Sequence, residues 1–285
     1  MKLSILYRGP LSSCNYGCDY CPFAKREEDA EALEVDRQAL ARFVARAGEL
    51  QDLTLSVLFT PWGEALVRSW YREAFVTLSH LPNVEKVAAQ TNLAGSTDFL
   101  ERCDLSKVAL WATYHPTQIS RARFVAKVKG LVDRGIRLSV GVVAVDGALP
   151  EIEALRQEVP TGVYVWVNAA KRVHGPYTDE DFTRLQRVDP LFGLNTVAHE
   201  SLGQRCFAGE RAVAVDGEGT LRRCHFVSAP IGNLYRDDFR EALKPRPCPN
   251  ATCGCHIGYV HLERLGLDRT FKGGILERIP STPPR

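Results

Sequence analysis

Six apolar segments alternate with amphipathic segments up to residue 169, and this alternation limits the folds open to the chain. The apolar runs have the length of buried strands and lie at residues 3–7, 52–59, 86–91, 107–113, 137–145 and 163–169. Segments with helical spacing of apolar residues lie between and after them, at residues 36–50, 67–81, 96–103, 120–135 and 150–159. Because strands that alternate with helices are joined by right-handed crossovers, the sequence predicts an α/β protein with a parallel sheet.

The pattern changes near residue 200. Residues 210–224 predict a hairpin that turns at Asp216 and Gly217, and a cysteine-rich segment follows it. We therefore expect a barrel-like core over residues 1–196 and a small C-terminal domain over residues 197–285, which contains the β-hairpin and the cysteine-rich segment.

The formal charge of the chain is nearly balanced, so it does not favour a strongly charged partner. The chain has 36 Lys and Arg against 34 Asp and Glu, which argues against nucleic acid and against an anionic membrane surface. The N-terminal apolar run is too short for a secretory leader, and no later run has the length of a membrane helix, so we expect a cytoplasmic protein. A reducing compartment favours metal binding or catalysis over disulfides for its cysteines.

Three cysteines, Cys14, Cys18 and Cys21, follow the first predicted strand directly. A zinc site usually has four ligands, and neither flank supplies an obvious fourth. An iron–sulfur cluster that is bound by three thiolates leaves one iron open to a small molecule. Since ligands gather at the C-terminal ends of parallel strands, we expect this loop at the mouth of the fold.

The Cys-x3-Cys-x2-Cys spacing, with Tyr20 before the last cysteine, resembles the signature of the radical S-adenosylmethionine superfamily. The resemblance implies a partial (β/α)6 TIM-like barrel, a [4Fe–4S] cluster on the three thiolates, and S-adenosylmethionine (AdoMet) on the open iron. It also implies reductive cleavage of AdoMet to a 5′-deoxyadenosyl radical, which takes a hydrogen atom from a substrate C–H bond. A reducing partner such as flavodoxin or ferredoxin would supply the electron.

Other family motifs follow later strands. Gly63 and Glu64 match part of the family's Gly-Gly-Glu-Pro segment, with Trp62 in place of the first glycine, and the resemblance implies that Glu64 accepts a hydrogen bond from the AdoMet ammonium. Asn92 resembles the family residue near the AdoMet ribose or carboxylate. The candidates for the adenine pocket, or for filling of the barrel, are Gly141, Val143, Trp166 and Asn168.

Polar residues after the fourth and sixth predicted strands are candidate substrate contacts. They are Tyr114, His115, Lys171, Arg172 and His174. His115 is also a candidate proton carrier, because the pKa of histidine lies near neutrality, although a local hydrogen bond is the alternative interpretation.

A second group of cysteines lies near the C-terminus and comprises Cys206, Cys224, Cys248, Cys253 and Cys255. Such ligands suit either a second cluster or zinc. The Cys-x12-Gly-x4-Cys opening resembles the twitch domain, a shortened relative of the SPASM domain, although the tail departs from the SPASM spacing. The resemblance implies one auxiliary [4Fe–4S] cluster on Cys206, Cys224, Cys255 and either Cys248 or Cys253. His256 is a further candidate ligand, and Cys103 is expected to be a buried apolar residue.

The function expected from the resemblance is radical AdoMet chemistry that oxidises or crosslinks a small molecule or a peptide. A non-catalytic iron–sulfur electron carrier or scaffold is the alternative from another class, and it would hold clusters without binding AdoMet. A radical AdoMet enzyme that modifies RNA is a second alternative, which the balanced charge disfavours.

Overall fold

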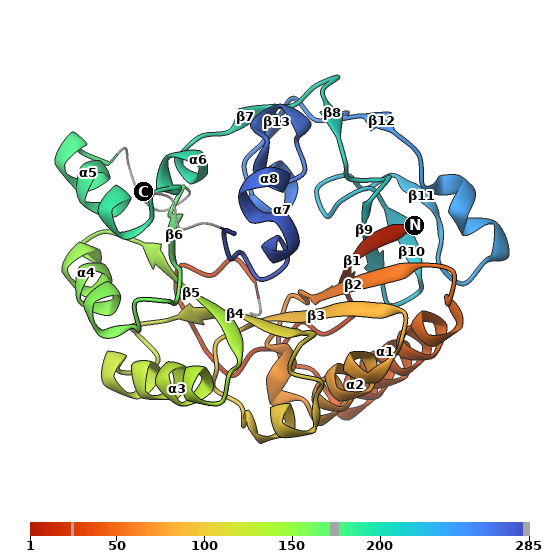
Figure 1. The fold of residues 1–285 in the computed structure, drawn as a ribbon, viewed down its shortest axis with the longest axis horizontal. Coiled ribbons are helices and arrows are strands. Elements are labelled where there is room, and N and C mark those ends of the chain that lie inside the picture. The colour runs from red at the N-terminus through yellow and green to blue at the C-terminus, as the bar shows by residue number, and fades with distance from the viewer. Residues whose placement is uncertain (24–25, 172–176, 282–285) are drawn as a thin grey trace.

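The computed structural model describes residues 1–23, 26–171 and 177–281, and within them a curved nine-stranded sheet encloses the centre of the molecule (Figure 1). The strand order is β11-β10-β9-β1-β2-β3-β4-β5-β6. The strands are β1 (Lys2–Arg8), β2 (Thr54–Phe59), β3 (Val84–Thr91), β4 (Val108–Tyr114), β5 (Arg137–Ala144), β6 (Val165–Ala169), β9 (Ala212–Asp216), β10 (Thr220–Arg222) and β11 (Pro230–Asn233). Strands β1 to β6 are parallel, which confirms the predicted α/β class.

Helices cover the outer, convex face of the parallel strands (Figure 1). They are α1 (Ala30–Glu49), α2 (Ser69–His80), α3 (Arg121–Asp133), α4 (Leu149–Glu158), α5 (Asp179–Val188) and α6 (Phe192–Thr196), with the 3₁₀ turns η1 (Ala65–Val67) and η2 (Asp98–Arg102). Helix α1 begins where the Asp29 side chain accepts a hydrogen bond from the backbone N–H of Ala32. Its buried face, which includes Leu40 and Phe43, packs into the outer core.

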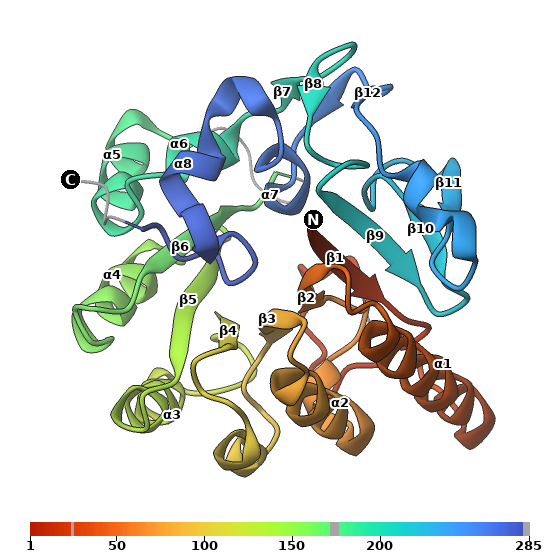
Figure 2. The same cartoon turned by 45° about the vertical axis from the view of Figure 1, so that its right-hand side comes forward.

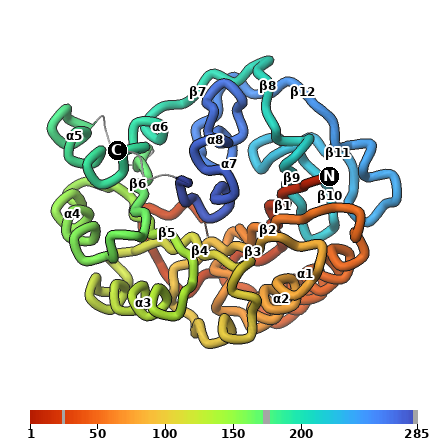
Figure 3. Tube along the Cα trace, viewed as in Figure 1, coloured from red at the N-terminus to blue at the C-terminus, as the bar shows by residue number. Residues whose placement is uncertain are grey.

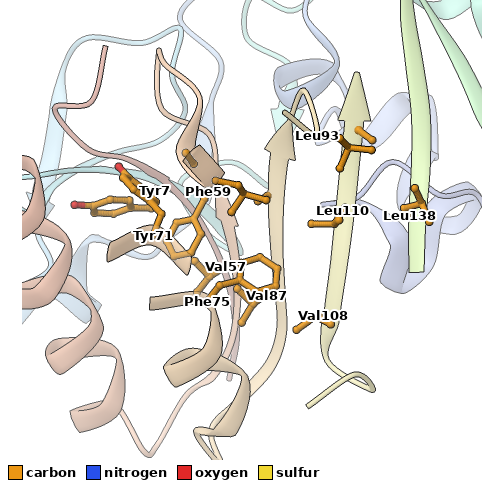
Figure 4. Close-up of a cluster of buried hydrophobic side chains, with 14 of the residues drawn as sticks. Tyr7, Val57, Phe59, Tyr71, Phe75, Val87, Leu93, Val108, Leu110 and Leu138 are labelled. Carbon is orange, nitrogen blue, oxygen red and sulfur yellow. The ribbon is translucent and has the colours of Figure 1, made fainter. Parts of the chain in front are cut away.

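Alternate residues of each parallel strand face opposite sides of the sheet. Val57 of β2 and Leu110 of β4 face outward and belong to the large core between sheet and helices, part of which is drawn in Figure 4. Leu58 and Trp111, one residue further along each strand, face the interior of the barrel. This alternation decides which side chains at the strand ends can reach the interior.

The C-terminal segment continues the same sheet. Strand β9 pairs in parallel with β1, from Ser4 opposite Ala212 onward, so β9, β10 and β11 lie beside the N-terminal strand (Figure 2). The predicted hairpin is present as antiparallel β9 and β10. Its turn depends on Gly219, whose φ of +76° suits glycine and whose N–H donates to the carbonyl of Asp216.

The remaining C-terminal elements are short, and the last of them lie inside the ring of strands (Figure 3). They are β7 (His199–Glu200), β8 (Arg205–Cys206), η3 (Asp237–Ala242), β12 (Arg246–Pro247), β13 (Thr252–Cys253), α7 (His256–Tyr259), η4 (Glu263–Leu265), α8 (Leu267–Phe271) and η5 (Lys272–Gly274). Ile257 and Leu276 pack against Trp111 and Trp166, so the C-terminal segment fills the barrel interior. None of the described helices has the length and apolar character that crossing a lipid bilayer requires.

Candidate functional site

The three-cysteine loop, residues 14–21, begins after β1 and is preceded by a segment that two carboxylates hold in place. The backbone N–H of Leu11 donates to Asp36 Oδ1 at 3.0 Å. The N–H of Ser13 donates to Glu28 Oε2 at 3.0 Å. Asp36 is fully buried in α1, and Glu28 lies just before that helix. The position of the loop is therefore fixed by α1 as well as by the strand that precedes it.

Gly63 allows the chain after β2 to pass close to this loop. Its N–H donates to the carbonyl of Leu11 at 3.2 Å, and the N–H of Glu64 donates to the carbonyl of Ser13 at 3.1 Å. A Cβ atom at Gly63 would lie 1.9 Å from the backbone oxygen of Ser13, which no side-chain rotation can relieve. A glycine is therefore required here by the close approach of two backbone segments.

Glu64 is buried, and its carboxylate accepts three hydrogen bonds from the protein. Oε1 accepts from the N–H of Leu66 at 3.1 Å and from the hydroxyl of Thr91 at 2.8 Å. Oε2 accepts from the N–H of Asn92 at 2.7 Å. Burial raises the pKa of Glu64 to about 6, and the three hydrogen bonds oppose that rise. Glu64 thus links the ends of β2 and β3.

Asn92 connects the end of β3 to the three-cysteine loop. Its amide Nδ2 donates to Asn15 Oδ1 at 3.1 Å and lies 3.7 Å from Cys14 Sγ. Its Oδ1 accepts from the N–H of Ala94 at 2.8 Å, which fixes the side chain at the strand end. Burial raises the pKa of the Cys14 thiol.

His115, which follows β4, contacts the same loop. Its Nδ1 lies 2.8 Å from the Tyr20 hydroxyl and 3.3 Å from Cys18 Sγ. Burial lowers the pKa of His115 to about 4, so the imidazole is neutral at pH 7. Tyr20 stacks along the His115 ring and is not among the described residues that line the cavity below.

Apart from Tyr20, the predicted residues from the first three strand ends meet His115 in one cavity of about 480 Å³. Among the residues that line it are Cys14, Cys18, Cys21, Glu64, Asn92 and His115. Its volume falls within the range of about 300–1,000 Å³ that is typical of small-molecule sites. Trp62, Gly63, Val143, Trp166 and Asn168 also line it, and 42% of the Trp62 surface is exposed.

The assignment of Tyr114 as a substrate contact is wrong, because this side chain faces away from the cavity. Tyr114 belongs to the outer core, packs against Phe124 of α3 and donates a hydrogen bond to Glu151 of α4 at 2.6 Å. Trp111 faces inward, so by strand alternation Tyr114, three residues further along, faces outward and His115 faces inward.

Two other candidates have structural contacts outside the cavity. Lys171 Nζ donates to the carbonyl of Gly254 at 2.6 Å and to that of Val197 at 3.2 Å, and so joins the end of β6 to the C-terminal segment. Gly141 leaves room for the Trp166 ring, since a Cβ atom there would lie 1.8 Å from that ring. Neither is among the described lining residues. The candidates Arg172 and His174 lie outside the described residues.

The remaining wall of the cavity contains residues that the sequence analysis did not single out as cavity residues. Arg8 comes from the end of β1, His225 follows β10, and Arg278 lies near the C-terminus. His256, a candidate metal ligand, is buried in this wall with its Nε2 unpartnered and its ring against Trp111. These positions carry no motif, and only the continuation of the sheet and the path of the C-terminal segment bring them here.

The five C-terminal cysteines lie near one another, and one of them also lines the cavity. Burial, together with the charges of the neighbouring Cys224, Cys206, Cys255 and Cys248 thiolates, raises the pKa of the Cys253 thiol to about 12. The other four side chains are therefore all neighbours of Cys253. Cys255 also lines the cavity, with Arg278, Lys171 and Arg8 as its cationic neighbours. Cys103 is buried in the outer core, as expected.

Within the described residues, no three His, Cys, Asp or Glu side chains are grouped closely enough to hold a metal ion. A [4Fe–4S] cluster binds each thiolate to a different iron atom, so its ligands need not converge on one point. All three cysteines of the loop line the cavity, and this donor set fits a cluster with one open iron.

Comparisons with known proteins identify the fold. No protein-family model matches the chain, and no curated protein matches it significantly. Among solved structures, histidine-tagged anSMEcpe with bound AdoMet is 13% identical, with a TM-score of 0.55 over 85% of this chain and 80% of that chain. Native anSMEcpe with bound AdoMet and the Cp18Cys peptide is also 13% identical, with a TM-score of 0.54 over 85% of this chain and 82% of that chain. The chain therefore has the fold of anSMEcpe, whose structures contain bound AdoMet.

Proposed function

We propose that this chain is a radical AdoMet enzyme. The observation that carries the proposal is the meeting of the three cysteines, Glu64 and Asn92 in one cavity of a protein with the fold of an AdoMet-bound structure. The spacing of the cysteines, the fold, and the meeting of these residues in one cavity are three separate features. An AdoMet site in this cavity accounts for all of them.

Cys14, Cys18 and Cys21 line the cavity and would hold a [4Fe–4S] cluster that has one iron without a protein ligand. When bound and reduced, the cluster and AdoMet would supply the radical that abstracts hydrogen from the substrate. The protein contributes an ordered loop, since the segment before the cysteines is bound by Asp36 and Glu28. Rigid placement of reacting groups is what such a cavity adds to the chemistry of its cofactor.

Glu64 and Asn92 would contact AdoMet. A carboxylate has about four acceptor sites, and three on Glu64 are used by the protein, which leaves room for one bond from the AdoMet ammonium. The same three bonds fix the orientation of the carboxylate. His115 would be a neutral hydrogen-bonding partner near the cluster loop, since burial keeps its pKa low.

We further propose that residues 197–285 bind one auxiliary [4Fe–4S] cluster. Cys206, Cys224, Cys248 and Cys255 are all electrostatic neighbours of Cys253, and Cys206 and Cys248 also affect Cys224, so we assign Cys206, Cys224, Cys248 and Cys253 as the ligands. This set differs from the sequence-based expectation in the place of Cys255, which lines the cavity instead.

The substrate would be a small molecule or a peptide that presents a C–H bond at the cavity. A peptide is bound in one of the anSMEcpe structures, which supports the peptide option by analogy of fold only. Electrons would come from a flavodoxin or ferredoxin in the cytoplasm.

Formation of 5′-deoxyadenosine tests the proposed function. The protein is reconstituted with iron and sulfide without oxygen, reduced with dithionite and mixed with AdoMet. We expect 5′-deoxyadenosine from the wild type and none from Cys18→Ala. Cys103→Ala is the matched control, because it removes a buried thiol that lies in the outer core and outside the cavity.

The outcomes separate the proposed function from its alternative. Product from the wild type and from Cys103→Ala, with none from Cys18→Ala, supports a radical AdoMet enzyme. Intact clusters that neither cleave AdoMet nor bind it, measured by equilibrium dialysis with labelled AdoMet, would refute the proposal in favour of an electron carrier or scaffold.

A further inference from the structure

Arg278 places a buried cation against the cavity. Only 2% of its surface is exposed, and it is one of the residues that line the cavity. In the part of the chain that the structure describes, its guanidinium forms no ion pair within 4 Å of a carboxylate, and its Nη1 has no hydrogen-bond partner. A buried charged group without such partners is unfavourable unless a ligand completes the site.

The backbone at Arg278 is in a conformation that arginine seldom adopts. Its φ is +54°, in the left-handed region that favours glycine and asparagine. The preceding residue holds this turn in place: the Glu277 carboxylate pairs with Lys86 and Arg137, and its carbonyl accepts from Ser139 Oγ at 2.6 Å. The fold therefore keeps a strained arginine where glycine would be easier to accommodate, which points to a use for the side chain.

The two tryptophans of the inner wall orient the guanidinium. Its centre lies 4.5 Å from the centroid of the Trp166 ring and 5.7 Å from that of Trp111. Stacking on a ring satisfies a face of the guanidinium and leaves the N–H donors at its edges for hydrogen bonds. Those donors suit a planar or tetrahedral oxyanion.

The charge of Arg278 acts on the carboxylate of Asp189, which already has hydrogen-bond partners. Asp189 accepts hydrogen bonds from the Tyr164 hydroxyl and from the N–H groups of Val167 and Leu191. It is fully buried and affects Arg278 only through the longer-range attraction of their charges. Asp189 therefore lowers the energy of the buried cation without using its donors.

Arg8 adds a second cation to this cavity. Its guanidinium lies 4.1 Å from the Trp62 ring centroid, and its Nε donates to the carbonyl of Thr60 at 2.9 Å. It forms no ion pair with a carboxylate of the described chain, and burial lowers its pKa only to about 10, so it stays charged at pH 7. Glu64 also lines the cavity, but its carboxylate is bound to the ends of β2 and β3.

We propose that Arg278 binds an oxyanion of the substrate, a carboxylate or a phosphate, and that Arg8 adds to the attraction of this anion. The inference rests on the proposed function, because it places a substrate beside AdoMet in the same cavity. It deepens that function by assigning an anionic substrate class.

Binding of two simple anions tests the assignment. The reconstituted protein with AdoMet is titrated with inorganic phosphate and, separately, with acetate in a buffer of low chloride, and binding is followed by calorimetry. We expect saturable binding of at least one anion, weakened about tenfold or more in Arg278→Asn, because hydrogen bonds between charged groups are lost. Asparagine tolerates the left-handed backbone, so this variant keeps the turn. The anion that binds distinguishes a phosphate from a carboxylate substrate.

Two further variants make the result decisive. Arg211→Asn is the matched control, since Arg211 also stacks on an aromatic ring, that of Phe207, but is exposed and pairs with Glu210. Its anion affinity is expected to equal that of the wild type. Arg278→Lys keeps the charge without the forked donors and is expected to fall between the wild type and Arg278→Asn. It replaces Arg278→Asn as the test if that variant does not fold.

Labelled AdoMet is measured in the same samples by equilibrium dialysis. Absence of anion binding in the wild type, or equal binding in the Arg278 variants, would overturn the assignment. Loss of AdoMet binding in Arg278→Asn but not in Arg211→Asn would also overturn it, since Arg278 would then hold the AdoMet carboxylate. A wild type that binds anion through Arg278 but does not bind AdoMet would refute the proposed function while leaving the anion site intact.

Discussion

Replacing Gly63 with alanine should displace the three-cysteine loop. The added Cβ would lie 1.9 Å from the carbonyl oxygen, 2.7 Å from the carbonyl carbon and 2.9 Å from the nitrogen of Ser13. All three are backbone atoms of the residue before Cys14, so the two segments must separate by roughly 1 Å or more to reach ordinary contact distance. Overpacking of this kind costs about 1–3 kcal/mol in the free energy of unfolding. Since each kcal/mol lowers the Tm by about 2 °C in a chain of this size, the Tm should fall by about 2–6 °C.

The loop displacement should also weaken the first cluster. We expect the iron content of Gly63→Ala, after reconstitution and desalting, to fall from about 8 towards about 4 per chain, with loss of AdoMet cleavage. Gly130→Ala is the control, because Gly130 lies in helix α3 with no atom within 4 Å of the added Cβ, and alanine favours a helix. A Tm within about 1 °C of the wild type together with full iron content in Gly63→Ala would show that the two segments are not in close contact.

Three other variants test separate parts of the site. Burial raises the pKa of Glu64 from 4.5 to about 6, so the folded state binds the carboxyl proton more tightly than the unfolded state does. As the pH rises between these two values, the free energy of unfolding of the cluster-free protein should therefore decrease by up to about 2 kcal/mol. Glu64→Gln should remove this decrease, as measured by urea unfolding at several pH values; an unchanged slope would contradict the assignment. Cys224→Ala should lower the iron content from about 8 to about 4 per chain, whereas Cys255→Ala should retain about 8, and equal losses would place Cys255 among the ligands. Tyr114→Phe removes the hydrogen bond to Glu151 and should cost about 1 kcal/mol of stability with unchanged 5′-deoxyadenosine formation; a large loss of product would return Tyr114 to the site.

The sequence could predict the strands and the residues at their ends, because both depend on local patterns. The spacing of apolar residues defines each βα unit, and parallel strands bring their C-terminal ends to one edge. Cys14, Glu64 and Asn92 could therefore be expected together, and they line one cavity. The prediction for Tyr114 assumed that every residue at a strand end faces the cavity, whereas neighbouring residues of a strand face opposite sides of the sheet.

The rest of the site depends on contacts between distant segments, which local patterns do not encode. Arg278 reaches the cavity because Glu277 binds Lys86 and Arg137, two residues on strands far earlier in the chain. Arg8 shares the cavity with His225 because β9 pairs with β1. No single residue in these segments indicates such a pairing. Motifs in the sequence therefore reveal the cysteines but not Arg8 and Arg278.

The wall that carries Arg278 is continuous with the segment that would bind the auxiliary cluster. Cys253 precedes His256 and Ile257 of the cavity wall by only a few residues, and Gly254 between them is bound by Lys171. A cluster held by Cys253 would bind the folded state only, and so would add to the free energy that keeps α7 in the barrel. The ion pairs of Glu277 hold the other end of the segment independently. Measurement of anion binding by Cys224→Ala separates these contributions. Retained affinity means that the Glu277 contacts are sufficient to position Arg278. Reduced affinity means that the auxiliary cluster also helps to position it.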